Sequence, residues 1–291
     1  PRLSWRIESD EQNVMQTAYH ILVASSPELL EQGKGDIWDS GKIESDASQW
    51  ITYQGKTLKC NAPYYWKVKI DTNKGATNWS APAFWTTGLF NEADWQGQWI
   101  GLDRAAPGDS ETQWSRLAAR YLRKEFAVKK DVKRATVHIA GMGLYELFIN
   151  GQRIGNQVLA PAPTDYRKTI LYNTYDVTSL LQTENAIGVT LGNGRFYTMR
   201  QNYKPYKIPT FGYPKLRLNL IVEYADGSKE TIATNTSWKL TTEGPIRSNN
   251  EYDGEEYDAR KELGAWTQTG YDDKNWMPAQ RVSIPSGTLR A

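Results

Sequence analysis

The chain has 291 residues, of which 39% are hydrophobic and 23% are charged, and its 35 basic residues nearly balance 33 acidic ones. That length and composition are typical of a folded protein with about two domains. A net charge of +2 produces no long-range field to attract nucleic acid or an anionic membrane, so neither is expected as a partner. The single cysteine, Cys60, excludes an intrachain disulfide, and no apolar run is long enough to span a bilayer.

Residues 1–90 are predicted to form a small all-β domain. Residues 18–23 and 64–70 alternate between the two faces of a half-buried strand. Residues 37–41 are expected to be a strand followed by a turn, and residues 83–87 a closing strand. Short strands at regular spacing, with turn residues between them, are typical of a β-sandwich.

Aromatic residues recur in a fixed order through this first domain. An early strand carries Trp5, a later strand has the pattern Y-x-W-x-V, and the last has the pattern W-S-x-x-x-F-x-T. This order resembles a fibronectin type III-like module. The one segment expected to be helical is short, at residues 27–32, with Ser26 as its N-cap.

A connector is expected at residues 91–118, followed by a second β-domain at residues 119–285. Residues 120–126 and 135–140 are predicted strands, and residues 213–224 alternate between aliphatic and polar side chains. Many antiparallel strands, almost no helical pattern and long irregular crossovers are typical of a jelly-roll sandwich. Carbohydrate-binding modules often have this architecture, but a fold alone does not establish a function.

The block that organises the second domain begins with a predicted β-hairpin. Apolar residues flank Asn150 and Gly151, the dipeptide most favourable for a type I′ turn. Further along, Asp176 is expected to cap one helical turn. A buried strand at residues 186–191 then runs into Gly-Asn-Gly at residues 192–194, where the glycines permit a sharp turn or a close backbone approach.

Five motifs lie in and after this block: N-G-x-x-[IV]-G, L-A-P-x-x-T-D-Y, Y-x-T-Y-D-V-T-x-L-L, N-A-I-G-V-x-L-G-x-G and E-x-Y-D-A-R. They resemble the N-terminal β-sandwich region of bacterial α-L-rhamnosidases, glycoside hydrolase family 78. The resemblance implies a parent enzyme that hydrolyses terminal α-L-rhamnosides with inversion, one carboxylic acid protonating the leaving oxygen while another activates water. It also implies that both acids lie in a later α/α domain. Residues 286–291 would then begin the link to it, and no catalytic residue is assigned here.

Some members of this family use the sandwich as a rhamnose-binding module with a calcium ion. Acidic and amide side chains hold the ion there, and calcium in general prefers oxygen ligands. The resemblance therefore implies calcium as a cofactor, with Asp165, Asn173 and Asn193 as candidate ligands. Asn193 is also a candidate for direct contact with the sugar.

In those members an aromatic side chain after the G-x-G pattern packs on the sugar ring. The position after Gly194, usually Trp in the family, is Arg195 here, and Phe196 and Tyr197 follow it. The resemblance makes these three residues the further candidates for a rhamnosyl-binding surface. The alternative is a structural sandwich that only supports the catalytic domain.

The densest acidic stretch covers residues 249–258. It can be a solvated loop, a surface that faces a ligand or another domain, or a catalytic pair. Glu256, Tyr257, Asp258 and Arg260 belong to the E-x-Y-D-A-R motif, for which the resemblance implies a role as interdomain scaffold; a contribution to the cleft is the alternative. Arg260 is suited to form a fork onto a carboxylate.

The sequence thus predicts the accessory N-terminal part of an α-L-rhamnosidase, with rhamnose-containing glycans and the protein's own C-terminal catalytic domain as partners. A stand-alone carbohydrate-binding module and a cell-surface adhesion module are the alternatives that stay open. The periplasm or the cell exterior is the expected compartment, because polysaccharides are degraded there.

Overall fold

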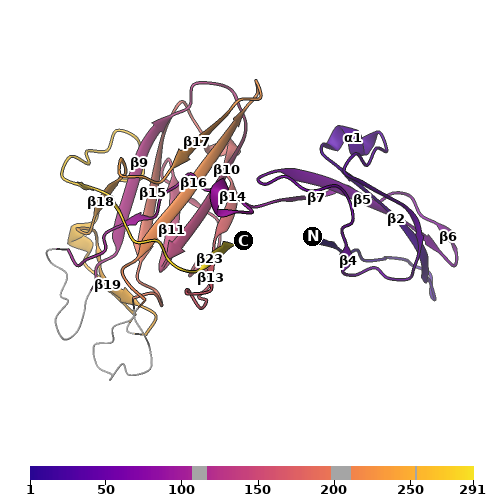
Figure 1. The fold of residues 1–291 in the computed structure, drawn as a ribbon, viewed down its shortest axis with the longest axis horizontal. Coiled ribbons are helices and arrows are strands. Elements are labelled where there is room, and N and C mark those ends of the chain that lie inside the picture. The colour runs from indigo at the N-terminus through magenta and orange to yellow at the C-terminus, as the bar shows by residue number, and fades with distance from the viewer. Residues whose placement is uncertain (107–116, 198–210, 253) are drawn as a thin grey trace. The chain divides into compact units, whose positions relative to one another are not determined.

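Figure 1 shows the chain as a computed structural model, in which all residues except 107–116, 198–210 and 253 are described. The chain divides into two compact units, Pro1–Gly88 and Leu89–Ala291. Regular structure is almost entirely β in both units, which confirms the predicted all-β sandwich class. Among the described residues, no helix has the length and apolar character needed to cross a membrane.

The first unit is built on a five-stranded antiparallel sheet in the order β3-β2-β5-β6, with β7 paired to β5. Its core lies on one face of the central strands, where Ile21, Val23 and Val68 are buried, and the small sheet β1-β4 adds Leu3 to it. The strands are β1 Arg2–Leu3, β2 Gln16–Ala24, β3 Trp38–Glu44, β4 Ile51–Thr52, β5 Pro63–Thr72, β6 Gly75–Ala76 and β7 Ala83–Thr86.

The predicted helix is confirmed as α1, Pro27–Glu31, and Ser26 Oγ accepts a hydrogen bond from Leu29 N at 3.3 Å.

The predicted turn at residues 37–41 is wrong, because β3 continues through Gly41. Ser40 and Gly41 together lie opposite Ile21, so the ladder contains a β-bulge, with Gly41 at φ +60°. Ser40 Oγ accepts the Ile21 N–H at 2.8 Å. A glycine in the left-handed region was compatible with either a turn or a bulge, and pairing with β2 decided between them.

The second unit contains two six-stranded sheets. One has the order β14-β10-β16-β8-β22 with β17 beside β16, and the other has the order β12-β11-β15-β9-β18-β21. The first consists of β8 Ile100–Gly101, β10 Val132–Met142, β14 Asn173–Asp176, β16 Lys215–Tyr224, β17 Lys229–Ala233 and β22 Gln280–Arg281. The second consists of β9 Arg120–Ala127, β11 Leu144–Ile149, β12 Gln152–Ile154, β15 Glu184–Gly192, β18 Lys239–Thr241 and β21 Met277–Pro278.

The described residues of this unit also form two small sheets and three 3₁₀ turns. They are the parallel pair β13 Thr169–Leu171 with β23 Thr288–Arg290, the hairpin β19 Ile246–Asn250 with β20 Gly254–Tyr257, and the turns Glu92–Asp94, Thr178–Leu180 and Ala259–Lys261. The segment predicted as a connector therefore contributes β8 to a main sheet, and the segment predicted as a link contributes β23.

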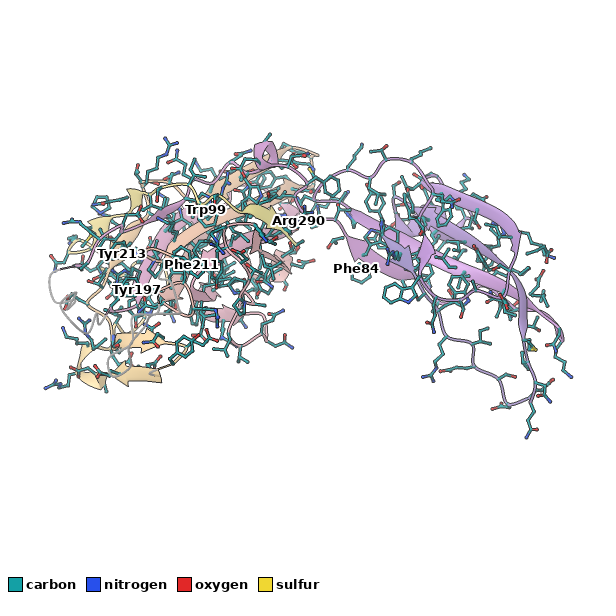
Figure 2. All side chains as sticks on the ribbon, turned by 60° about the horizontal axis from the view of Figure 1, so that its bottom comes forward. Phe84, Trp99, Tyr197, Phe211, Tyr213 and Arg290 are labelled. Carbon is teal, nitrogen blue, oxygen red and sulfur yellow. The ribbon has the colours of Figure 1, made fainter. Side chains whose placement is uncertain are left out.

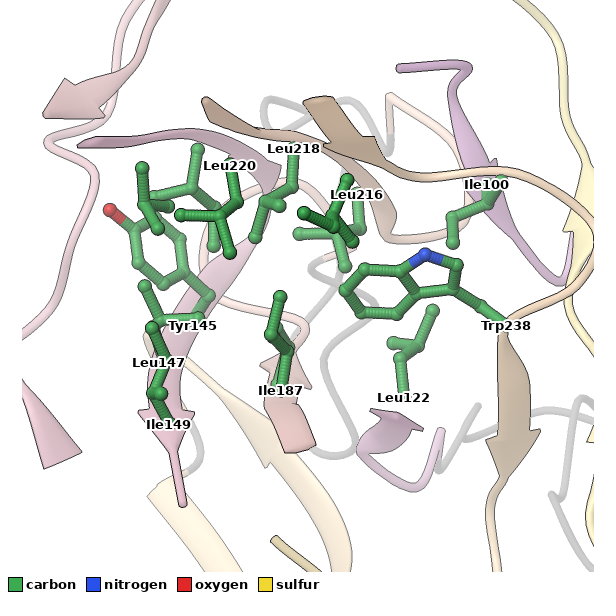
Figure 3. Close-up of a cluster of buried hydrophobic side chains, with 14 of the residues drawn as sticks. Ile100, Leu122, Tyr145, Leu147, Ile149, Ile187, Leu216, Leu218, Leu220 and Trp238 are labelled. Carbon is green, nitrogen blue, oxygen red and sulfur yellow. The ribbon is translucent and has the colours of Figure 1, made fainter. Parts of the chain in front are cut away.

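The main core fills the space between the two large sheets. Figure 3 shows Leu216, Leu218 and Leu220 of β16 on one side of it, facing Leu122 of β9 and Ile187 of β15. All five side chains are fully buried. Apolar alternation along facing strands thus produces one continuous apolar layer, as expected for a sandwich.

The outer face of β16 is buried as well. Lys215, Arg217 and Asn219 are almost fully buried because the segment before β9 lies over them. Arg217 Nε donates to Gly97 O at 2.6 Å, and its guanidinium lies 5.2 Å from the centre of the Trp95 ring. Asn219 Oδ1 accepts from Gly97 N at 2.8 Å. Each buried polar group shown here has a partner, as burial of such groups requires.

The predicted hairpin is confirmed between β11 and β12, with Leu147 paired to Ile154. Asn150 and Gly151 have φ values of +51° and +84°, as a type I′ turn requires. The Asn150 side chain also accepts from Ala186 N at 2.8 Å, which fixes the turn to the start of β15.

Candidate functional site

The Gly-Asn-Gly turn at the end of β15 joins several of the residues predicted to bind ligands. Asn193 O accepts hydrogen bonds from Phe196 N and Tyr197 N at 3.1 and 3.2 Å, so the chain reverses sharply here. A Cβ on Gly192 would lie 2.8 Å from Asn249 Oδ1, which is closer than real contacts allow. The predicted need for close backbone approach is therefore met at Gly192.

Asn193 is a buried junction of three segments. It is 2% exposed; its backbone N–H donates to Asn249 Oδ1 at 2.6 Å, and its Nδ2 donates to Leu117 O at 2.7 Å. Asn193 Oδ1 and Asn249 Nδ2 are buried without a hydrogen-bond partner among the described residues. The observed bonds give Asn193 a structural role, and contact with a sugar stays a prediction.

Arg195 lies at the surface, above this junction. Its Nη1 is 3.3 Å from Glu251 Oε2 and 3.0 Å from Tyr252 OH, and the Arg195 side chain is 42% exposed. This cluster presents charged and hydroxyl groups to solvent, which is the chemistry that recognises sugar hydroxyls. Glu251 and Tyr252 were not singled out from the sequence beyond their place in the acidic stretch, because only the fold brings them to Arg195.

Phe196 and Tyr197 point into the protein. Phe196 is 3% exposed, with ring centres 5.3 Å from Tyr166 and 6.0 Å from Phe211. Tyr197 is 5% exposed and stacks on Tyr213 at 5.6 Å; Figure 2 shows Tyr197, Phe211 and Tyr213 close together. Rings buried to this extent anchor the turn and have little face to offer to a sugar. A role in sugar binding stays a prediction for both.

The candidate calcium ligands are engaged elsewhere. Asp165 accepts a fork from Arg167 at 2.9 and 3.3 Å, and this hydrogen bonding holds the pKa of Asp165 below its usual range. Asn173 Oδ1 accepts from Tyr145 OH at 2.7 Å. Among the described residues, no group of three or more His, Cys, Asp or Glu side chains could hold a metal ion. Calcium takes six to eight oxygen ligands. These side chains therefore do not fit a preassembled calcium site, and calcium binding stays a prediction.

The E-x-Y-D-A-R motif starts on β20, whose four residues are all exposed. Tyr257 is 53% exposed, and Glu256 precedes it on the strand. Arg260 forms the expected fork, donating to both oxygens of Asp258 at 2.8 Å, and this hydrogen bonding lowers the pKa of Asp258 to about 2. The motif thus forms the solvent-facing base of the β19–β20 hairpin. Asp253, in the same acidic stretch, lies outside the described residues.

A general acid of a glycosidase needs a carboxyl group whose pKa is raised. In this chain the carboxyl pKa values that shift are lowered, because hydrogen bonds and nearby cations together outweigh the effect of burial. The described carboxyl groups whose pKa departs from its ordinary value are all lowered: Asp39, Asp71, Asp103, Asp165, Glu223, Asp226, Glu243 and Asp258.

A hollow of about 500 Å³ lies over the outer face of β9, around Arg123 and Tyr271. Arg123 is 1% exposed, and its Nε donates to Trp266 O at 2.9 Å and its Nη2 to Gln268 O at 3.0 Å. It also pairs with Asp273. The guanidinium nitrogens all bind protein groups, and these bonds hold the segment before β21 against the sheet. We therefore assign this hollow a structural role.

These features define a class: a protein of two β-sandwich units in which the Gly-Asn-Gly turn meets the β19–β20 hairpin at one end of the second unit. Residues 130–291 match the family model described as the α-L-rhamnosidase N-terminal domain. Residues 1–91 match the model of the Rha78A-like, N-terminal immunoglobulin domain. The chain belongs to the family of α-L-rhamnosidase N-terminal domains, and the resemblance seen in its motifs is confirmed.

Named relatives agree with this assignment. An α-L-rhamnosidase of Formosa agariphila is 40% identical over 303 residues, covering 97% of this chain and 32% of the relative. The solved α-L-rhamnosidase of Dictyoglumus thermophilum superposes with a TM-score of 0.86 at 40% identity, over 98% of this chain and 32% of that one. The Streptomyces avermitilis α-L-rhamnosidase, solved in complex with L-rhamnose, gives 0.87 at 25% identity, over 98% and 43%. This chain spans 31% to 44% of the length of the curated relatives it matches.

Proposed function

We propose that this chain is the accessory N-terminal part of an α-L-rhamnosidase and supports the catalytic part of the same polypeptide. The proposal rests on the lengths of the matched regions. Relatives named α-L-rhamnosidase match 97% or more of this chain, while this chain spans less than half the length of each relative. The parent reaction would be hydrolysis of terminal α-L-rhamnosides, performed outside these residues.

The hairpin base around Glu256, Tyr257, Asp258 and Arg260 is the surface we assign to the catalytic part. Tyr257 offers an exposed aromatic ring beside a charged pair whose geometry is already fixed. Aromatic residues and arginine are the side chains that most often anchor interfaces. A prearranged Asp258–Arg260 fork loses little entropy when it meets a second polar surface.

The test compares the full-length parent protein, the parent without residues 1–291, and residues 1–291 alone. Release of rhamnose from a chromogenic α-L-rhamnoside and the melting temperature are measured for each. The proposal expects no release by residues 1–291 alone, and an unstable or poorly active remainder without them. Rhamnose release by residues 1–291 alone would contradict it.

A second candidate function is binding of rhamnosyl groups at the Gly-Asn-Gly turn, supported by the exposed cluster of Arg195, Glu251 and Tyr252. Calorimetric titration of L-rhamnose into residues 1–291, with calcium and then with a chelator, tests it. Binding that is lost on chelation and in Arg195→Ala, but kept in Arg260→Ala, would support both the sugar site and the metal. If only the heat of dilution is measured, both with calcium and with chelator, rhamnose binding is contradicted and the supporting role is the function that remains.

A further inference from the structure

The loop between β12 and β13 presents two adjacent apolar side chains to solvent. Val158 is 77% exposed and Leu159 is 73% exposed, which makes them the two most exposed large hydrophobic residues of the described chain. Single exposed apolar residues are ordinary on protein surfaces. Two neighbours at one loop tip form a contiguous apolar projection, which is less ordinary than a single exposed residue.

The backbone of this loop is held on both sides of the projection. Gln157 O accepts from Arg153 Nη2 at 2.7 Å, and Gln157 Oε1 accepts from Tyr175 OH at 3.2 Å. On the other side, Ala160 O accepts from Tyr145 N at 2.8 Å, and Ala160 is buried. The exposure of the two side chains is therefore a property of a braced loop.

Leu159 also has an unfavourable backbone conformation. Its φ is +56°, in the left-handed region that leucine rarely adopts. A strained conformation persists only when interactions with the surrounding structure offset its energetic cost, and such residues are frequent at binding sites. The hydrogen bonds at Gln157 and Ala160 hold the backbone in this conformation, and the Leu159 side chain is left 73% exposed.

The projection lies at the same end of the second unit as the Gly-Asn-Gly turn. Tyr145, which holds Ala160, pairs with Leu191 of β15, and Leu191 stands two residues before Asn193. The loop that carries the apolar tip is thus bonded to β11, and the turn with its Arg195 cluster follows β15, which lies beside β11 in the same sheet. A single partner surface can contact both.

We infer that Val158 and Leu159 form the apolar anchor through which this unit docks on the catalytic part of the same polypeptide. This inference rests on the proposed function, and it adds a site that is separate from the β19–β20 hairpin. The length of the relatives identifies the occupant: more than half of each relative's chain lies outside the matched region. Burial of these two aliphatic side chains against a partner removes apolar surface from water, which favours association.

The test uses two substitutions at Leu159, in the full-length parent protein and in residues 1–291. Leu159→Asn removes the apolar contact but suits the left-handed backbone, since Asn tolerates positive φ. Leu159→Asp adds a charge that cannot be buried unpaired. Ile284→Asp is the matched control, because Ile284 is 69% exposed on the same unit and outside the loop.

In residues 1–291 alone, Leu159→Asn is expected to leave the melting temperature unchanged or raise it. In the full-length protein, both Leu159 variants should speed proteolytic separation of the two parts at least about tenfold, while Ile284→Asp should not. A tenfold change corresponds to a loss of about 1.4 kcal/mol in the free energy of docking. Opposite behaviour in the two proteins is the signature of docking, because a purely structural role of Leu159 would lower stability in both.

The inference is wrong if Leu159→Asp and Ile284→Asp behave alike in the full-length protein. It is also wrong if residues 1–291 self-associate through this loop, shown by a dimer that Leu159→Asp dissolves, since the occupant would then be a second copy. Failure of the proposed function is recognised separately: removal of residues 1–291 would leave the stability and activity of the remainder unchanged.

Discussion

Arg123→Met should destabilise the second unit far more than an ordinary arginine substitution. Two hydrogen bonds from the guanidinium to backbone carbonyls, those of Trp266 and Gln268, are lost. Bonds from a charged group contribute about 1.5–3 kcal/mol each. The ion pairs with Glu125 and Asp273 add less, since those carboxylate side chains are 41% and 25% exposed.

Methionine restores part of the apolar contact that the arginine stem makes, so the net loss in free energy of unfolding is about 3–5 kcal/mol. For a unit of roughly 200 residues this lowers the melting temperature by about 10 °C. Calorimetry of residues 1–291 measures it, with the transition of the first unit as an internal reference. The fluorescence of Tyr271 should change as well, because the Tyr271 ring lies 5.3 Å from the Arg123 guanidinium.

Arg260→Met is the matched control. Arg260 makes a fork of similar geometry onto Asp258, but its side chain is 90% exposed. Solvent screening makes such a pair nearly neutral in its effect on stability. Equal melting temperatures for Arg123→Met and Arg260→Met would refute the reasoning. They would show that burial of the arginine does not determine how much its bonds contribute to stability.

Three further predictions concern the same unit. Gly188→Ala should lower the free energy of unfolding, measured by urea titration, by about 1–3 kcal/mol, because the new Cβ would lie 2.5 Å from Thr267 Cγ2. An unchanged urea midpoint would mean that the segment around Thr267 shifts without cost, against this prediction. Burial, with a smaller effect from Arg134, lowers the pKa of His138 to about 4, below its unfolded value near 6.5. The unfolded state then binds the proton first, so stability should fall by up to about 3 kcal/mol as pH drops from 6.5 to 4, and His138→Gln should flatten that slope. Asn150→Ala should lower stability by about 2–3 kcal/mol, since it removes side-chain bonds and the tolerance for φ +51°; a loss no larger than that of an exposed Asn→Ala variant would count against this.

Local patterns in the sequence were sufficient for the parts of the fold that depend on neighbours along the chain. Asn150 and Gly151 specify their own turn through backbone preference, and Ser26 caps α1 with its own hydroxyl. The bulge at Gly41 shows the limit, because a turn was predicted there, while the outcome depended on pairing with β2. The candidate site followed the same division: the Gly-Asn-Gly turn was foreseen, but not that Phe196 would be buried beneath it.

The sequence by itself determined that this protein is all-β, where its main hairpin turns, and to which family it belongs, because alternation, turn chemistry and motif spacing are local properties. The tertiary structure decided which polar side chains are buried. Alternation along β16 separates Leu218 from Arg217, yet both are covered, since a segment about 120 residues earlier folds over the polar face and supplies the partners of Arg217. Burial depends on contacts between distant segments, and a pattern along one strand carries no information about them.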